Sequence, residues 1–221
     1  MMGPPGAGKG TQAVRLAEAE GLCRISTGDL LRAALAEGTS LGREAERFMQ
    51  VGELVPDDVI LQMVDEEVDR SACSEGAVFD GFPRTVAQAR GLKDLLAGRG
   101  AELDQVIVLD VPEEEVVRRL SGRRVCKSCE KLYHISFDPP MQDGRCDACG
   151  GELTQRPDDR PETIRRRLAV YREETQPVRE YYESGAGAPR RGVAEVAGGQ
   201  SIDAVAVEVR RSVAAGARAA Q

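Results

Sequence analysis

Short apolar runs alternate with longer stretches of helical periodicity along most of this chain. The apolar runs predict buried strands at 23–25, 77–79, 106–109 and 192–196. Apolar residues three and four positions apart predict helices at 11–20, 30–36, 41–51, 85–96, 161–183 and 202–215, and two more that begin at 56 and 113. This alternation indicates an α/β fold, in which helices cover both faces of a parallel sheet.

The first residues carry a motif for binding phosphate. Residues 3–11 read Gly-Pro-Pro-Gly-Ala-Gly-Lys-Gly-Thr, and we call them the phosphate loop. Glycines let such a loop turn its N–H groups toward an anion, while Lys9 and the start of the following helix add positive charge. The pattern is typical of nucleotide binding. Only Met1 and Met2 precede the loop, although such loops follow a buried strand, so we expect the natural protein to begin a few residues earlier.

Two other motifs follow predicted strands. Asp80 ends one apolar run and leads into Gly-Phe-Pro-Arg at 81–84. A carboxylate at the end of a buried strand, in a chain with a phosphate loop, suits the organisation of Mg²⁺, and a helix cap is the alternative. Thr27 lies in the sequence Ser-Thr-Gly-Asp at 26–29, where a helix cap is also the simplest interpretation.

The stretch 122–159 differs in composition from its surroundings and contains two Cys-x-x-Cys pairs. These are Cys126 with Cys129, and Cys146 with Cys149. Their spacing is typical of a four-thiolate zinc site, which is structural because it leaves no open coordination position. Two disulfides are the alternative, and a reducing compartment disfavours them. Cys23 and Cys73 are expected to be buried thiols.

Composition limits the classes of function. The 221 residues, 41% of them hydrophobic, suffice for one domain with an insertion. No apolar run reaches the roughly 20 residues of a membrane span and no signal segment is evident, so we expect a cytoplasmic protein without a membrane partner. A net charge of -7 argues against nucleic acid as a partner, and a single histidine excludes catalysis by paired histidines.

Arginines nevertheless gather in the second half of the chain. They are Arg119, Arg123, Arg124, Arg156, Arg160, Arg165, Arg166 and Arg167. A run of arginines often marks only a solvated face. Guanidinium groups also bind phosphate oxygens in a bidentate way, and this interpretation fits a chain with a phosphate loop.

Taken in order, these motifs resemble the adenylate kinase family. The resemblance rests on the phosphate loop, Ser-Thr-Gly-Asp at 26–29, Asp-Gly-Phe-Pro-Arg at 80–84, Gly-Arg-Arg at 122–124 and Asp-Asp at 158–159, and covers nearly the whole chain. It is closest to the bacterial type with a long zinc-binding lid. The resemblance implies a monomer that transfers a phosphoryl group reversibly from ATP to AMP, giving two ADP, with Mg²⁺ on ATP and Zn²⁺ in the lid. It implies a P-loop core at 1–121 and 160–221, a mobile AMP-binding flap at 26–55 and the lid at 122–159.

The resemblance also assigns residues to each ligand. ATP would be held by Gly6, Ala7, Gly8, Lys9, Gly10, Thr11, Arg119, Arg123, Tyr133, His134 and Gln200. AMP would be held by Thr27, Arg32, Glu53, Leu54, Val55, Gly81, Phe82, Pro83, Arg84, Gln88, Arg156 and Arg167. The catalytic groups would be Lys9, Asp80, Arg84, Arg123, Arg156 and Arg167. Within these sets Arg32 and Arg84 would grip the AMP phosphate, and Gln88 would read the adenine edge.

Three other functions remain open at this point. A kinase for GMP, UMP or CMP would share every motif, because base choice depends on a few contacts. A zinc-ribbon binding protein with a silent phosphate loop would suit the cysteine pairs but leave Asp80 and the arginines without a role. A secreted disulfide-bonded domain would need a signal segment.

Overall fold

The computed structural model describes residues 1–70, 73, 75–185 and 187–219, with side chains up to 215. Two pairs of parallel strands form its centre: β1 (Cys23–Ser26) with β2 (Ala77–Asp80), and β3 (Val106–Asp110) with β7 (Val193–Ala197). Met1 and Met2 lie between the pairs. The Met1 amine donates to the Phe79 carbonyl over 2.5 Å, and Met2 forms a parallel bridge with Val108. The order is therefore β1, β2, residues 1–2, β3 and β7, which confirms the parallel α/β sheet.

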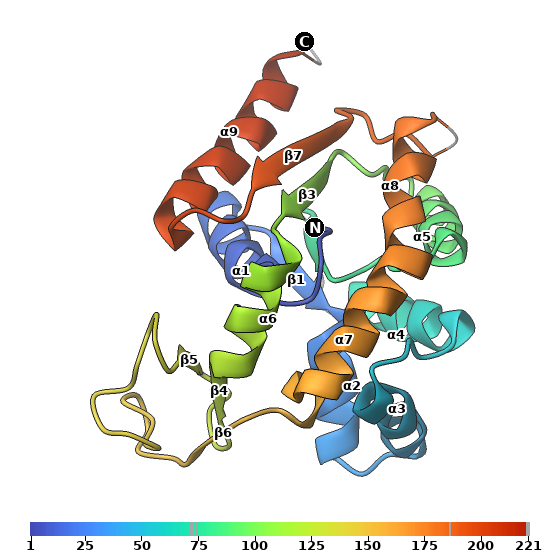
Figure 1. Ribbon diagram of the computed structural model, residues 1–221. Helices are drawn as coiled ribbons and strands as arrows, with labels where there is room; N and C mark the ends of the chain where they lie inside the picture. Colours follow the sequence, from blue (N-terminus) through green and yellow to red (C-terminus); the bar gives the residue numbers. More distant parts are fainter. Residues whose placement is uncertain (71–72, 74, 186, 220–221) are drawn as a thin grey trace.

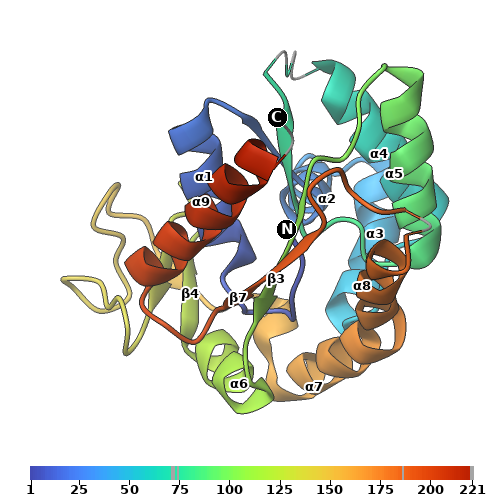
Figure 2. The ribbon, with the colours of Figure 1, turned by 90° about the horizontal axis from the view of Figure 1, so that it is seen from above.

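Helices cover both faces of this sheet (Figures 1 and 2). They are α1 (Lys9–Glu20), α2 (Thr27–Ala36), α3 (Ser40–Val51), α4 (Asp57–Arg70), α5 (Val86–Gly98), α6 (Glu113–Gly122), α7 (Pro161–Val170), α8 (Gln176–Glu183) and α9 (Ile202–Ala219). Side chains of β3 alternate between the faces, so Ile107 and Leu109 pack in one core cluster with residues of α1 and α9, and Val106 and Val108 in another with residues of α5 and α8. A strand buried on both faces needs the unbroken apolar run that the sequence shows.

A small antiparallel sheet stands apart from the parallel one in Figure 1. Its order is β5 (Leu132–His134), β4 (Arg123–Cys126) and β6 (Leu153–Thr154). It was not predicted, because strands this short show little periodicity. A 3₁₀ turn (Pro157–Asp159) leads from this sheet back to α7.

Two predicted helices differ in detail from those observed. The helix predicted at 161–183 consists of α7, a π-helical turn (Tyr171–Thr175) and α8. Pro177 lies at the start of α8 and has no N–H to donate, and the wider turn before it accommodates the ring. The helix predicted from residue 30 begins at Thr27, because the Ser26 side chain accepts a bond from the Asp29 N–H and caps it.

One prediction about the cysteines is wrong. Cys23 and Cys73 form a disulfide, with Cα atoms 5.5 Å apart. The pairing of Cys23 with Ala77 in adjacent strands brings the loop before β2 next to the start of β1.

None of the described helices combines the length and apolar character needed to cross a membrane.

Candidate functional site

A cavity of about 1240 Å³ opens at the carboxyl ends of the parallel strands, and we call it the central cavity. In open parallel sheets this edge is where ligands bind. All residues that the resemblance assigned to nucleotides or to catalysis line it, with the exception of Phe82. Phe82 is 1% exposed and packs in the core near Phe79. Its ring therefore packs in the core and not in the cavity lining, and the expected contact of Phe82 with AMP stays a prediction.

The phosphate loop joins residues 1–2 to α1. Gly8 takes the left-handed conformation, with φ 93°, at the position that caps α1, and Gly6 has φ 77°. A methyl group at Gly6 would also lie 2.8 Å from Leu120 Cγ, so both positions favour glycine. Lys9 Nζ donates to the carbonyls of Gly3 and Pro4, each over 2.7 Å. Burial, followed by the charge of Arg84, lowers the pKa of Lys9 to about 7.

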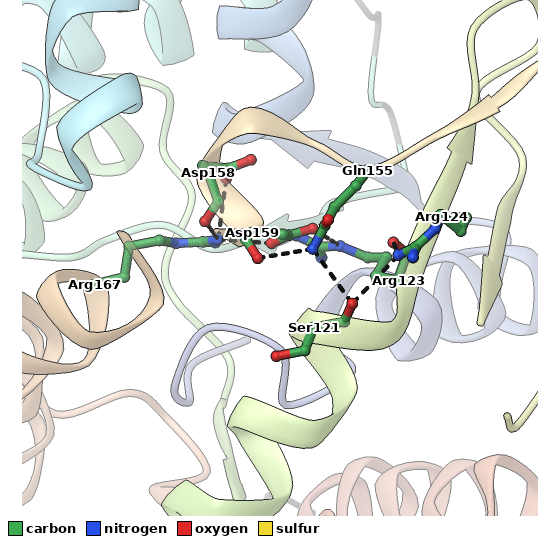
Figure 3. Close-up of polar contacts among 7 residues, drawn as sticks. All are labelled: Ser121, Arg123, Arg124, Gln155, Asp158, Asp159 and Arg167. Atoms are coloured by element: carbon green, nitrogen blue, oxygen red, sulfur yellow. Dashed lines mark hydrogen bonds and ion pairs between the residues drawn. The ribbon is translucent and has the colours of Figure 1, made fainter. Parts of the chain in front are cut away.

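Two arginines converge on one carboxylate beside the loop (Figure 3). Asp159 is completely buried and accepts from Arg123 at 2.7 and 2.6 Å and from Arg167 at 3.1 Å. Arg167 also lies 3.0 Å from a carboxylate oxygen of Asp158. Burial raises the pKa of Asp158, but the charges of Arg167 and Arg123 outweigh it and the net shift is downward. These carboxylates fix the directions in which the two guanidinium groups point.

Arg84 and Arg156 also line the cavity, and neither forms an ion pair with a carboxylate among the described residues. Burial and the charge of Arg167 lower the pKa of Arg84 to about 10, and burial and the charge of Arg32 lower that of Arg156 to about 10. Among the described residues, the buried Nε of Arg156 finds no hydrogen-bond partner. A positive charge that is desolvated and beside like charges gains most from a bound anion. The charges of the central cavity therefore favour an anionic ligand.

A chain of ion pairs lines the central cavity next to Gly10 of the phosphate loop. We call it the ion-pair chain, and its members are Arg32, Asp29, Arg24 and Asp80 in that order. Nη2 of Arg24 lies 2.7 Å from an oxygen of Asp29 and 2.7 Å from an oxygen of Asp80. Asp80 thus pairs with Arg24 and is not a helix cap, because Thr85 caps the helix that follows it. Its expected role toward Mg²⁺ stays a prediction.

The ion-pair chain shifts the pKa values of two of its members. Partial burial lowers the pKa of Arg24, but its bonds to Asp80 and Asp29 outweigh this and raise it. Burial of Asp29 is likewise outweighed by Arg32 and Arg24, so its pKa is lowered. Sequence reasoning missed Arg24. The available signal was a charged residue in the middle of a short predicted strand.

Gln88 of α5 and Thr27 of α2 both line the central cavity. The Gln88 amide donates to Asp57 over 2.7 Å and accepts from the Arg84 N–H over 2.8 Å, and it is 2% exposed. Thr27 donates to the Gly81 carbonyl over 3.2 Å, so its hydroxyl ties the start of α2 to the residue after β2, and the side chain that caps α2 is that of Ser26. Asp57 was missed because only the fold brings it to Gln88.

Aromatic and cationic groups gather at the edge of the small sheet. The rings of His134 and Phe137 stack with centroids 4.2 Å apart, and the Arg118 guanidinium lies 4.6 Å from the centroid of Phe137. Both Arg118 and Phe137 line the central cavity but were not predicted. Tyr133 is 4% exposed, and its hydroxyl contacts Cys146 Sγ at 3.4 Å. Its hydroxyl therefore supports the cysteines.

The four paired cysteines form one cluster. Their Sγ atoms all lie within 4.8 Å of one another, and all four are free thiols. Cys126 and Cys149 lie 3.4 Å apart, and Cys129 and Cys146 lie 3.5 Å apart. Zinc–sulfur bonds of about 2.3 Å in a tetrahedron separate the sulfur atoms by about 3.8 Å. The cluster thus fits a four-thiolate zinc site, and the two-disulfide alternative is not what the structure shows.

Comparison with known proteins gives a consistent result. A family model described as adenylate kinase matches residues 1–186. The chain is 51% identical to an adenylate kinase of Thermodesulfovibrio yellowstonii over 205 residues, which cover 92% of this chain and 93% of the relative. It is 48% identical to an adenylate kinase of Symbiobacterium thermophilum over 215 residues, 97% of each chain. An adenylate kinase of Archaeoglobus fulgidus is 51% identical over 181 residues, 82% of this chain and 83% of the relative.

Proposed function

The chain belongs to the adenylate kinase family, and on that premise we propose that it transfers a phosphoryl group reversibly from ATP to AMP in the central cavity. The observation that carries this proposal is the convergence of Lys9, Arg84, Arg123, Arg156 and Arg167 on one anion site at the carboxyl ends of the strands. A cavity of about 1240 Å³ is larger than one drug-sized ligand needs and suits two nucleotides held end to end.

We assign the ATP phosphates to the phosphate loop. The N–H groups at the start of α1 and the ammonium of Lys9 favour a polyanion there. The stacked pair of His134 and Phe137, together with Arg119 and the backbone at Gln200, would hold the adenine of ATP. Arg119 already donates to the Gly198 carbonyl over 2.9 Å, which keeps its side chain against the loop that carries Gln200.

We assign AMP to the opposite wall. Its phosphate would bind Arg32 and Arg84, and its base would lie along residues 53–55 and near Gln88. In the structure Gln88 bonds to Asp57 and to the Arg84 backbone, so a base that pairs with Gln88 has to replace or share one of these contacts. Adenine and guanine differ in donors and acceptors at this edge, and Gln88 with Asp57 is the place where base choice would be decided.

The transfer itself needs positioning more than acid–base chemistry. The acceptor is a phosphate that is already ionised, so no general base is required. Arg123, Arg156 and Arg167 would surround the transferring group and stabilise the charge on its oxygens. Asp159 holds two of these arginines in place before substrate arrives, so little reorganisation is needed at the moment of transfer.

Two metal ions fit this chain. The carboxylates of Asp80 and Asp29 lie beside the phosphate loop and are ligands of the type that Mg²⁺ prefers. When bound, Mg²⁺ neutralises charge on the ATP phosphates. The four-cysteine cluster fits Zn²⁺, which would stiffen a small sheet with a minimal core.

We further propose that residues 26–55 act as a flap and 122–159 as a lid. Both carry cavity-lining side chains on elements outside the parallel sheet, and closure over both nucleotides would exclude water as a rival acceptor. A cytoplasmic location and a monomeric state remain predictions.

The test is ADP formation by the purified chain with ATP, Mg²⁺ and a panel of AMP, GMP, UMP and CMP. We expect strong turnover with AMP alone. Turnover with another monophosphate would overturn the base assignment, and nucleotide binding without any turnover would overturn the activity.

A pair of variants tests the site itself. Arg84→Ala should lower kcat/KM for AMP by about 10²- to 10³-fold, because it removes charge-assisted bonds to a phosphate. Arg70→Ala is the matched control, since Arg70 lies on the exposed face of α4, outside the cavity lining, and pairs with Glu67 of the same helix. Equal activity of the two variants would refute the assignment of Arg84.

A further inference from the structure

Arg24 bridges two carboxylates in the wall of the central cavity. One nitrogen, Nη2, lies 2.7 Å from carboxylate oxygens of both Asp29 and Asp80. Asp29 is bound on its other oxygen by Arg32, whereas Asp80 is 7% exposed and Arg24 is its only salt-bridge partner among the described residues. The two carboxylates therefore meet at a point that a single cationic atom already fills.

This point lies directly against the phosphate loop. A methyl group on the Cα of Gly10 would lie 3.2 Å from the Asp80 carboxylate and 3.6 Å from Arg24 Nη2. The Arg24 backbone is fixed because it pairs with Val78 in the parallel sheet, but its side chain is held mainly by the two carboxylates. Its buried Nε has no hydrogen-bond partner within the described parts of the chain. The guanidinium can therefore leave the two carboxylates without breaking any further side-chain hydrogen bond found among the described residues.

A divalent cation between these carboxylates and the phosphates of a nucleotide would need the same oxygens. Carboxylate oxygens bind Mg²⁺ at about 2.1 Å, which leaves no room for an N–H donor on the same lone pair. Before a metal binds, the charges of Asp29 and Asp80 are balanced by Arg24 and Arg32. A metal that arrives without nucleotide would thus add two positive charges to a neutral group.

We propose that Arg24 is a positioning residue that competes with the divalent cation for Asp29 and Asp80, so that the metal binds well only together with nucleotide phosphates. The phosphates supply the negative charge that the metal and the displaced guanidinium then share. The identity of the nucleotide rests on the proposed function. The competition between Arg24 and the metal does not depend on it.

The test measures metal binding without nucleotide and without catalysis. Mn²⁺ is added to the zinc-loaded protein, and free Mn²⁺ is followed by its paramagnetic resonance signal, since Mn²⁺ prefers the same oxygen ligands as Mg²⁺. Arg24→Gln should bind Mn²⁺ about tenfold more tightly than the unchanged protein, because the substitution removes a charge-assisted bond that competes with the metal for the carboxylates. Asp80→Asn added to Arg24→Gln should abolish the gain.

The chain offers a matched control. Arg99 also bridges two carboxylates, Asp65 at 2.8 Å and Asp69 at 2.6 Å, but outside the central cavity. Arg99→Gln frees an equal number of carboxylates and should leave Mn²⁺ affinity unchanged. A tenfold gain in Arg99→Gln as well would show that any freed acidic pair binds Mn²⁺, and would overturn the role of Arg24.

An unchanged or weaker Mn²⁺ affinity in Arg24→Gln would also overturn the proposal, because Arg24 would then only support the carboxylates. If Arg24→Gln does not fold, as judged by its urea midpoint, Arg24→Lys replaces it. A lysine ammonium lacks the planar set of N–H donors of arginine and competes less well for the carboxylates, so Arg24→Lys should bind Mn²⁺ about three times more tightly than the unchanged protein. An unchanged Mn²⁺ affinity in Arg24→Lys would count against the proposal. The ADP assay is independent of these measurements, so a wrong activity and a wrong role for Arg24 are distinguishable.

Discussion

Lys9 gives the sharpest prediction, because its ionisation must change when nucleotide binds. Burial and Arg84 lower the pKa of Lys9 to about 7, so in the free protein at pH 8 about nine-tenths of it is neutral. Phosphate oxygens beside the amine favour the charged form and raise this pKa again. Binding of Mg-ATP should therefore take up about 0.9 proton at pH 8.

The sign of the pH dependence follows from this uptake. A reaction that binds a proton is favoured at low pH, so the affinity for Mg-ATP should fall as pH rises above 7, by up to about tenfold per unit. Mg-ATP itself does not contribute to the proton uptake at pH 8, because a phosphate with a second pKa of about 6 is already fully ionised there.

Titration calorimetry in buffers of different ionisation enthalpy measures the proton number directly. The slope of observed enthalpy against buffer enthalpy should be about 0.9 for the unchanged chain at pH 8. Lys9→Arg is the control, since a guanidinium stays charged throughout and should give a slope near zero. A zero slope in the unchanged chain, or an equal slope in Lys9→Arg, would refute the reasoning.

Three further predictions concern stability. Asp159→Asn leaves Arg123 and Arg167 without their buried counter-charge and should lower the free energy of unfolding by about 3 kcal/mol, measured by urea denaturation against Asp158→Asn, whose carboxylate is less buried. Replacing both Cys23 and Cys73 by serine opens a loop with a sequence separation of 50 and should cost up to about 4 kcal/mol in the same measurement. Cys129→Ser should lower the melting temperature and the zinc content well before it lowers activity in the cold, because the cluster lies outside the central cavity.

Each of these has an outcome that would contradict it. Equal losses in the two aspartate variants would mean that burial of Asp159 does not decide its contribution. An unchanged urea midpoint after loss of the disulfide would mean that the link does not restrain the unfolded chain. A large loss of activity in Cys129→Ser without any loss of stability would place the cluster in the chemistry.

Local pattern was enough to predict much of this protein. The phosphate loop could be identified because Gly6, Gly8 and Lys9 act within a few residues of one another, and backbone freedom and charge at that range do not depend on the rest of the fold. The buried strands and their helices followed from periodicity for the same reason. The cysteine pairs were recognisable because spacing alone restricts how thiolates can share an ion.

Contacts between distant segments were beyond such reasoning. Arg24 meets Asp80 only because β1 and β2 are paired in register, and the same register joins Cys23 to Cys73, which the sequence left as free thiols. Asp159 reaches Arg123 only through the turn that leads from the small sheet back to α7. Residue type predicted that this chain binds phosphate, but which charges are paired and which stay free for a ligand depends on burial and register, and these exist only in the folded chain.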